Sequence, residues 1–383
     1  MVLTHRAAMI RAGAGPAMQG GGRMPSLASV DWKRIDAEPP RPLRLQRSEQ
    51  APLPHAPVVI VTWTEAEWAA LEHVFCGSTR SMSPEQALSG SWQREWIAYK
   101  RGYRTVERSL PPQAPSRTLG AWGRYRMASL GPELAPVLLF KSDMHVSTDG
   151  PHLPLEDLIR RIAVETRAEL LLTIGTAGGA RLDQCIGTVV VSNTFKLDLE
   201  GELAGRSFSG EFFSSDYRPD PTLLERVRAR LFRSIPVRRS DLRRLASSVG
   251  CSLDQVMNPT LEPGRLSKRC QSWLAGDPTA PTSLIRPVLT SNGYRLGTTE
   301  ESCGQYSCLE MDDALVARAA SRLPLRVGSV RNVSDPVVNA TLDPKTQESW
   351  SHLVYSTYGL YTSENGALAA WALIQGNREG AAS

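Results

Sequence analysis

Two aspartates are placed so that their carboxyl groups could act together. Asp312 lies in EMDDA (310–314), where a helix pattern begins, and Asp335 ends RNVSD (331–335), after an apolar strand pattern. One helix and one strand separate them, so both carboxylates could meet at the same edge of a sheet. A carboxylate pair at such an edge is a candidate for acid–base chemistry. The structural alternatives are a helix cap at Asp312 and a turn at Asp335, directly before Pro336.

A glycine-rich stretch lies between two apolar runs in LLLTIGTAGGARLDQCIGTVVVSN (170–193). Gly175, Gly178 and Gly179 follow the first run and predict a turn where something approaches the backbone closely. Ligands of open α/β sheets bind beyond the carboxyl ends of strands. Amide groups there can face a phosphate or a sugar hydroxyl, and Thr176 adds a hydroxyl group. A turn with a purely structural role is the alternative.

Two further segments carry polar side chains directly after strand patterns. Glu67 follows the first strand pattern in TWTEAEW, and its structural alternative is a solvated helix residue. Lys141 and His145 follow another strand pattern in KSDMH (141–145). A lone histidine is more often a hydrogen-bonded structural residue than a catalyst, so this segment alone does not define a site.

The elements that must position these residues alternate between strands and helices. Apolar, β-branched runs predict strands at 57–63, 136–143, 170–175, 188–193 and 325–333. Helical spacing predicts helices at 64–75, 154–168 and 366–376, with one more directly after EMDD. Thr64 is the expected N-cap of the first helix, with Glu67 three residues later. This order, with continuously apolar strands, predicts a mostly parallel sheet covered by helices.

Three parts of the chain depart from the alternating pattern. Residues 1–56 are rich in Gly, Pro, Ala and Arg, with no acidic residue before Asp31, and predict a disordered tail or an over-extended start upstream of Met24. The folded domain is expected at 57–376, followed by a short tail at 377–383. Within the domain, about 211–287 is expected to be a mainly helical surface insertion, because it carries the basic segments RVRARLFRS and VRRSDLRRLA.

Composition excludes several classes of protein. The 44 basic and 39 acidic residues are mixed along most of the 383-residue chain, so the net charge of +5 forms no stripe of the kind that binds nucleic acid. No apolar run reaches the roughly 18 residues of a membrane-spanning helix. The six cysteines form no CxxC pair and the histidines do not cluster beside them, so neither a metal nor another cofactor is expected. We interpret the cysteines as reduced, in a cytoplasmic protein.

Three separated segments resemble the nucleoside phosphorylase and nucleosidase superfamily, which includes purine nucleoside phosphorylases and methylthioadenosine/S-adenosylhomocysteine nucleosidases. They are VVIVTWTEAE, the glycine-rich stretch quoted above, and EMDDALVARAA with RVGSVRNVSD. The resemblance implies a three-layer α/β/α sandwich around a twisted, mixed, largely parallel sheet, here with a helical insertion. It also implies a homo-oligomer that cleaves the N-glycosidic bond of a purine nucleoside or nucleotide.

Carried over position by position, the resemblance assigns the base and the sugar to different residues. Asp335 would be the general acid that protonates the purine N7, with Ser334 supporting it. Met311 would pack on the sugar, and Asp312 would hold the ribose 2′- and 3′-hydroxyls.

The same resemblance places Thr176, Ala177 and Gly178 near the anomeric carbon and the nucleophile. Glu67 falls where the nucleosidase branch has the carboxylate that activates water. The base also needs an aromatic or apolar wall, for which Phe195 and Tyr294 are the candidates.

Two departures from the family pattern leave alternatives open. Asp312 stands where the family usually has the longer Glu. The segment KSDMHVSTDG resembles a phosphate-binding loop, so Lys141 and His145 could bind inorganic phosphate or the phosphate of a nucleotide. Hydrolysis is favoured because Glu67 occupies the water-activating position and no arginine phosphate clamp is visible. The alternatives are phosphorolysis and a module that senses a nucleoside or nucleotide without turnover.

Overall fold

A computed structural model describes residues 24–132, 134–182, 184–257, 261, 273–275, 287–293, 303–336 and 342–379. The strands it describes belong to one mixed sheet, whose main path runs β1-β4-β5-β2-β6-β12-β11-β8-β9. Strand β13 branches from this path by pairing with β6 and β7, while β10 pairs with β7 and β3 with β4. The strands are β1 (Arg41–Leu43), β2 (Val58–Thr62), β3 (Ile97–Tyr99), β4 (Gly123–Ser129), β5 (Val137–Ser142), β6 (Leu170–Gly179), β7 (Val189–Ser192), β8 (Thr194–Leu197), β9 (Phe212–Ser214), β10 (Trp273–Ala275), β11 (Val288–Thr290), β12 (Cys308–Glu310) and β13 (Arg326–Pro336).

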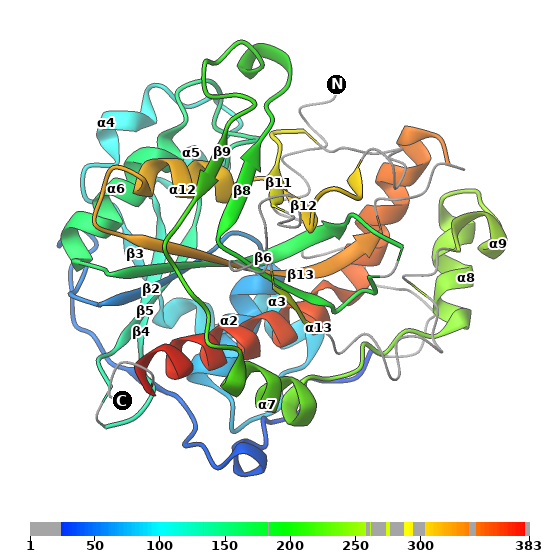
Figure 1. The fold of residues 1–383 in the computed structure, drawn as a ribbon, viewed down its shortest axis with the longest axis horizontal. Helices are drawn as coiled ribbons and strands as arrows, with labels where there is room; N and C mark the ends of the chain where they lie inside the picture. The colour runs from blue at the N-terminus through cyan, green and yellow to red at the C-terminus, as the bar shows by residue number, and fades with distance from the viewer. Residues whose placement is uncertain are drawn as a thin grey trace.

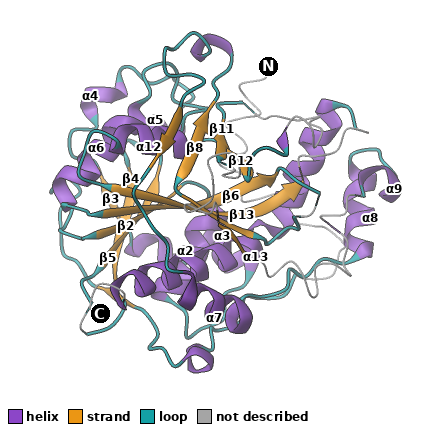
Figure 2. Ribbon diagram, in the orientation of Figure 1, coloured by secondary structure: helices purple, strands orange, loops and turns teal. Residues whose placement is uncertain are grey.

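Helices cover both faces of the sheet (Figures 1 and 2). One face packs against α2, α7 and α13, and the other against α6 and α12. The helices are η1 (Trp32–Ile35), α2 (Glu65–Cys76), α3 (Pro84–Ser89), η2 (Ser91–Glu95), α4 (Arg104–Glu107), α5 (Pro115–Leu119), α6 (Pro154–Thr166), η3 (Gly201–Leu203), α7 (Pro221–Leu231), α8 (Arg239–Ser248), α9 (Leu253–Val256), α12 (Asp313–Ala320) and α13 (Pro344–Glu379). The predicted α/β/α sandwich with a mixed sheet is confirmed.

The central strands are apolar on both sides because they serve two cores. Strand β2 is buried at every position and pairs in parallel with β5 and β6. Its side chains alternate, so that Val59 and Val61 enter the core under α6 and α12, while Val58 and Ile60 enter the core under α2 and α13. This two-sided burial explains the continuous apolar runs that the sequence shows.

The glycine-rich stretch is not the turn that the sequence predicts. Strand β6 continues through it to Gly179, because β13 pairs with β6 in parallel along its length and places Gly178 beside Asp335. A register shift between Val333 and Asp335 marks an irregularity at this end of β13. The prediction of a turn at Gly175 was therefore wrong.

The chain ends also differ from expectation. Within the predicted tail 1–56, residues from 24 onward are part of the fold: Trp32 and Ile35 of η1 are buried, and β1 pairs with β4. The last helix, α13, begins at Pro344 rather than near 366 and reaches Glu379. The described part of 211–287 contains the two predicted basic helices as α7 and α8, together with β9, α9 and β10.

Two further observations concern the cysteines and the helix lengths. Cys185 is disulfide-bonded, so the interpretation of all six cysteines as reduced was wrong. The cytoplasmic location, which depended on it, stays a prediction. Among the described helices, none combines the length and apolar character that crossing a membrane requires.

Candidate active site

A cavity of about 130 Å³ opens where several chain segments that bear polar groups meet. It lies between the β2–α2 junction, the carboxyl ends of β6 and β13, the β12–α12 junction, the segment after β5 and helix α13. Nine of the residues singled out in the sequence line it: Glu67, His145, Thr176, Ala177, Gly178, Met311, Asp312, Ser334 and Asp335. The tertiary structure thus brings together groups separated by more than 260 positions in the chain.

The Glu67 carboxylate is held by five donors. Its Oε2 accepts hydrogen bonds from Thr62 Oγ1 (2.8 Å) and the amides of Trp63 (3.1 Å) and Thr64 (2.9 Å). Its Oε1 accepts from the amide (2.7 Å) and hydroxyl (2.8 Å) of Thr176. Burial alone would raise the pKa of Glu67, but Arg331 and these hydrogen bonds outweigh it and lower that pKa below its usual value. Glu67 is therefore an anion with a fixed orientation.

The local sequence explains how Glu67 reaches this position. Thr64 is the N-cap of α2, and its hydroxyl and the Glu67 carboxylate form a capping box with each other's backbone amides. The predicted cap is confirmed. The same carboxylate also crosses to Thr176 on β6, so one side chain both begins the helix and joins it to the sheet.

Asp335 lies almost fully buried at the end of β13. Its Oδ1 accepts a hydrogen bond from Ser334 Oγ at 2.6 Å, whereas its Oδ2 accepts none from the described residues. Burial raises the pKa of Asp335 to about 6, against the opposing effect of the nearby Ser334 and Ser351 hydroxyls. A carboxyl group with such a pKa can hold and release a proton near neutral pH.

An arginine that the sequence analysis overlooked lies at the centre of the site. Arg331 is 3% exposed, and its Nε donates to Asp313 Oδ2 at 2.8 Å while its Nη2 contacts Asp313 Oδ1 and lies 3.1 Å from Glu310 Oε2. Its guanidinium also lies 5.2 Å from the centre of the Trp63 ring. An arginine within an otherwise apolar buried strand pattern was the available signal, because a buried cation needs partners.

Arg331 also explains the first glycine of the glycine-rich stretch. A Cβ atom at Gly175 would lie 2.0 Å from Arg331 Nη1 and 3.2 Å from Glu67 Oε1. The close approach that the sequence predicts is therefore made, at Gly175, by side chains of this protein.

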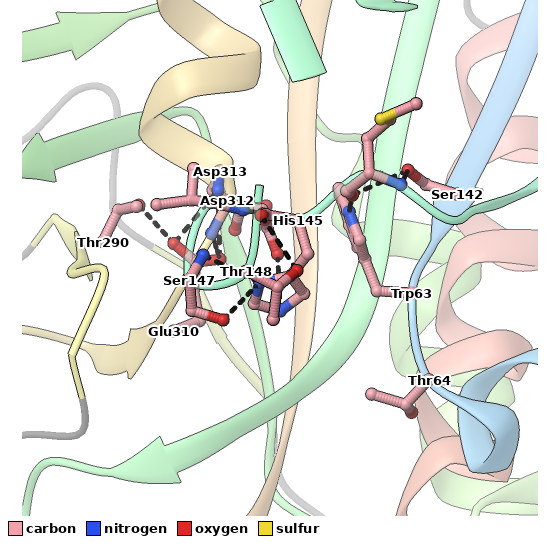
Figure 3. A network of polar contacts seen from close by, with 12 residues as sticks. Trp63, Thr64, Ser142, His145, Ser147, Thr148, Thr290, Glu310, Asp312 and Asp313 are labelled. Carbon is pink, nitrogen blue, oxygen red and sulfur yellow. Dashed lines mark hydrogen bonds and ion pairs between the residues drawn. The ribbon is translucent and has the colours of Figure 1, made fainter. Parts of the chain in front are cut away.

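Glu310 organises the start of α12. Its carboxylate accepts hydrogen bonds from the amides of Asp312 (2.7 Å) and Asp313 (3.0 and 3.1 Å) and from the Thr290 hydroxyl (Figure 3). Burial and the neighbouring Asp313 and Asp312 raise the pKa of Glu310, while Arg331 and Thr290 oppose them. These bonds fix the backbone at Asp312, two residues further on, whose side chain lines the cavity. Sequence reasoning missed Glu310 because two of its partners, Thr290 and Arg331, lie about 20 positions away in the chain.

The segment after β5 reaches Asp312. Val146 donates its amide to Asp312 Oδ1 at 3.1 Å, and His145 Nε2 lies 3.3 Å from Asp312 Oδ2. Burial raises the pKa of Asp312 to about 8, with Asp313 and Glu67 adding to this effect and the Val146 amide and Arg331 opposing it. Burial likewise lowers the pKa of His145 to about 4, helped by Arg331 and Lys141 and opposed by Glu67.

Three candidate residues from the sequence are not among the described residues that line the cavity. Lys141 is buried in an ion pair with Asp143 and does not line it. Phe195 packs in the hydrophobic core under α12 rather than against a ligand. Tyr294 lies outside the described residues. The aromatic side chains among the described lining residues are instead Trp63 and Tyr355, the latter on the part of α13 that the sequence did not predict as helix.

A family model described as the phosphorylase superfamily matches residues 142–353, which is more than half of the chain. The chain belongs to this superfamily. The match includes His145, Thr176, Asp312, Arg331 and Asp335, whereas Glu67 precedes it. No curated protein sequence matches the chain.

Among solved structures, a 5′-methylthioadenosine/S-adenosylhomocysteine nucleosidase from Neisseria meningitidis is 12% identical, with 83% of this chain and 98% of that chain covered and a TM-score of 0.41. The corresponding Streptococcus pneumoniae nucleosidase, with 8-aminoadenine, is 12% identical over 83% and 98%, with a TM-score of 0.42. A futalosine hydrolase of Helicobacter pylori is 10% identical over 83% and 97%, with a TM-score of 0.41. Membership of the superfamily follows from the family model alone.

Proposed function

We propose that this member of the superfamily hydrolyses the N-glycosidic bond of a purine nucleoside that carries no phosphate. The observation that supports this most directly is the charge of the cavity. Its described lining contains the ionised Glu67 carboxylate, three carboxyl groups of raised pKa from Glu310, Asp312 and Asp335, the Arg331 guanidinium, and the imidazoles of His145 and His352. Because Arg331 is already paired with Asp313 and Glu310, the site suits a ligand that becomes positive.

Cleavage of an N-glycosidic bond produces such a charge. As the bond between the anomeric carbon and the purine nitrogen breaks, the ribose acquires oxocarbenium character and the purine acquires negative charge. Asp335 is the proposed acid, because its pKa near 6 allows it to donate a proton to the leaving base. Its Oδ2, which no described residue engages, is the oxygen available for that contact.

Glu67 is the proposed partner of the attacking water. Five donors keep this carboxylate ionised and fixed, so its main effect is to stabilise the positive sugar. To orient the water and receive its proton, Oε1 must exchange the Thr176 hydroxyl for the water, because a carboxylate oxygen has two acceptor positions. The water oxygen bonds to the anomeric carbon, and one water proton passes to the carboxylate as the sugar charge disappears. The products are free base and free ribose, so the proton given by Asp335 is replaced by the proton released from water.

Phosphate has no evident binding group in the described part of the site. The amides of residues 145–149, which the sequence suggested as a phosphate-binding loop, are all engaged within the protein. Lys141 is paired outside the cavity, and the ionised Glu67 carboxylate would repel an anion. These observations support water over phosphate as the nucleophile, and a nucleoside over a nucleotide as the substrate.

The test is chromatography of free bases after incubation of the protein with purine nucleosides and their 5′-monophosphates, with and without inorganic phosphate. We expect base and free ribose from a nucleoside, without added phosphate and with little turnover of the monophosphate. Ribose 1-phosphate formed only with phosphate would instead establish a phosphorylase. Binding without base release from any compound would favour a sensing module.

A further inference from the structure

The segment His145–Asp149 forms a closed hydrogen-bonded unit. The amide of His145 donates to Asp149 Oδ2 (2.6 Å), while the amides of Thr148 (3.1 Å) and Asp149 (3.0 Å) donate to the His145 carbonyl. The two amides between them point elsewhere: Ser147 donates to His145 Nδ1 and Val146 to Asp312. Each amide in this segment thus has an acceptor, which makes the segment a rigid support.

The same contacts determine which ring nitrogen of His145 carries hydrogen. The Ser147 amide lies 3.2 Å from Nδ1, and the Ser147 hydroxyl lies 2.8 Å from the same atom. Because a backbone amide can only donate, Nδ1 must be the unprotonated acceptor. In a neutral imidazole the hydrogen is then on Nε2, which lies 3.3 Å from Asp312 Oδ2 (Figure 3).

Asp312 is consequently held at both carboxylate oxygens. Val146 contacts Oδ1 and His145 contacts Oδ2, so the side chain cannot rotate without losing one of them. Asp312 and His145 both line the cavity. Whether Asp312 is ionised or protonated, each of its oxygens keeps the capacity for one more hydrogen bond, because a hydroxyl group can both donate and accept. Two such oxygens match two neighbouring hydroxyl groups.

We propose that His145 is a positioning residue that aims Asp312 at the 2′- and 3′-hydroxyls of a ribose, so that the site selects ribonucleosides over 2′-deoxyribonucleosides. This inference rests on the proposed nucleosidase function. In this proposal the segment after β5 does not bind a phosphate. It orients the carboxyl group of Asp312 instead. It also explains how the shorter aspartate side chain is kept in a defined position.

The experiment compares kcat/KM for adenosine, inosine and guanosine with kcat/KM for their 2′-deoxy counterparts. For the wild-type protein we expect a preference for ribose of about 10- to 100-fold, the size typical of one hydrogen bond to a charged group. His145→Ala should lower kcat/KM for the ribonucleosides by a similar factor and leave the 2′-deoxynucleosides within about threefold, so that the preference disappears.

Two matched variants separate positioning from general damage. His145→Gln places an amide N–H near the Nε2 position and should restore most of the preference. His152→Ala removes an exposed histidine from the same connection and should leave both substrate classes unchanged. Equal losses for ribose and deoxyribose substrates in His145→Ala, or an unchanged preference, would overturn the proposal.

Failure of the proposed function gives a different result from failure of this inference. If no nucleoside releases its base, hydrolysis is wrong, and calorimetric binding of the same six compounds then tests the role of His145. Tighter binding of the ribose compounds that is lost in His145→Ala would support the positioning role. Equal binding of ribose and deoxyribose compounds, or no binding, would overturn it.

Discussion

The substitution Gly175→Ala tests whether the glycine-rich stretch is shaped by Arg331. The added Cβ atom would lie 2.0 Å from Arg331 Nη1 and 3.0 Å from its Cζ. Arg331 cannot easily move aside, because Asp313 and Glu310 hold it in a buried ion pair. The methyl group must therefore displace either the guanidinium or the backbone of β6.

The magnitude follows from what displacement would break. Separating one partner from a buried ion pair typically costs about 3–5 kcal/mol, because a charge is left uncompensated. Because the unfolding entropy grows with chain length, each kcal/mol lowers the melting temperature of a domain of this size by roughly 1–2 °C. We therefore expect a decrease on the order of 5 °C, together with loss of base release, since Arg331 and Glu67 share the cavity.

The assay is thermal unfolding combined with the base-release measurement. Gly205→Ala is the matched control, because its added Cβ meets nothing within 4 Å. In an Arg331→Met background, which removes the clashing atom, Gly175→Ala should cost less than about 1 kcal/mol, as overpacking is relieved. A melting temperature of Gly175→Ala equal to that of wild type, or an equal cost in both backgrounds, would show that Arg331 does not constrain position 175.

Three other expectations follow from the carboxylates of the site. Asp335→Asn should reduce kcat by about 10²- to 10⁴-fold. Because the pKa of Asp335 is raised from 3.8 to about 6, its ionisation destabilises the fold above pH 4. Relative to the wild type, the Asn variant should therefore become more stable as pH rises from about 4 to 6, by on the order of 1–3 kcal/mol. A free energy of unfolding in urea that falls relative to the wild type over this range would contradict the expectation. In the wild type, kcat/KM should fall as pH rises through about 6, because the acid must be protonated; a pH-independent rate would exclude Asp335 as that acid. Glu67→Gln should abolish base release and lower the free energy of unfolding by about 1–3 kcal/mol, because the NH₂ group of glutamine would face the N–H and O–H donors that now bind the carboxylate. Thermal unfolding and activity equal to wild type would show that the hydrogen bonds to Glu67 are unimportant.

Features that depend on near neighbours could be predicted from the sequence. The strand at 57–63, the helix at 64–75 and the Thr64–Glu67 capping box lie within one continuous segment, and each formed as predicted. The expectation that Asp312 and Asp335 meet also needed only the order of one helix and one strand. Both line the same cavity, because consecutive β12–α12–β13 elements bring their ends together.

Contacts between distant segments could not be predicted from the sequence. Residues 175–179 look like a turn in isolation, yet the pairing partner β13, about 150 positions away, extends them as strand. The ion pair of Arg331, the contact of His145 with Asp312 and the Tyr355 wall likewise join elements whose proximity no local pattern encodes. These contacts are not predictable because hydrophobic patterning specifies which face of an element is buried, but not which polar group the neighbouring element places against it. Burial then forces those polar groups to find partners, and the partners define the site.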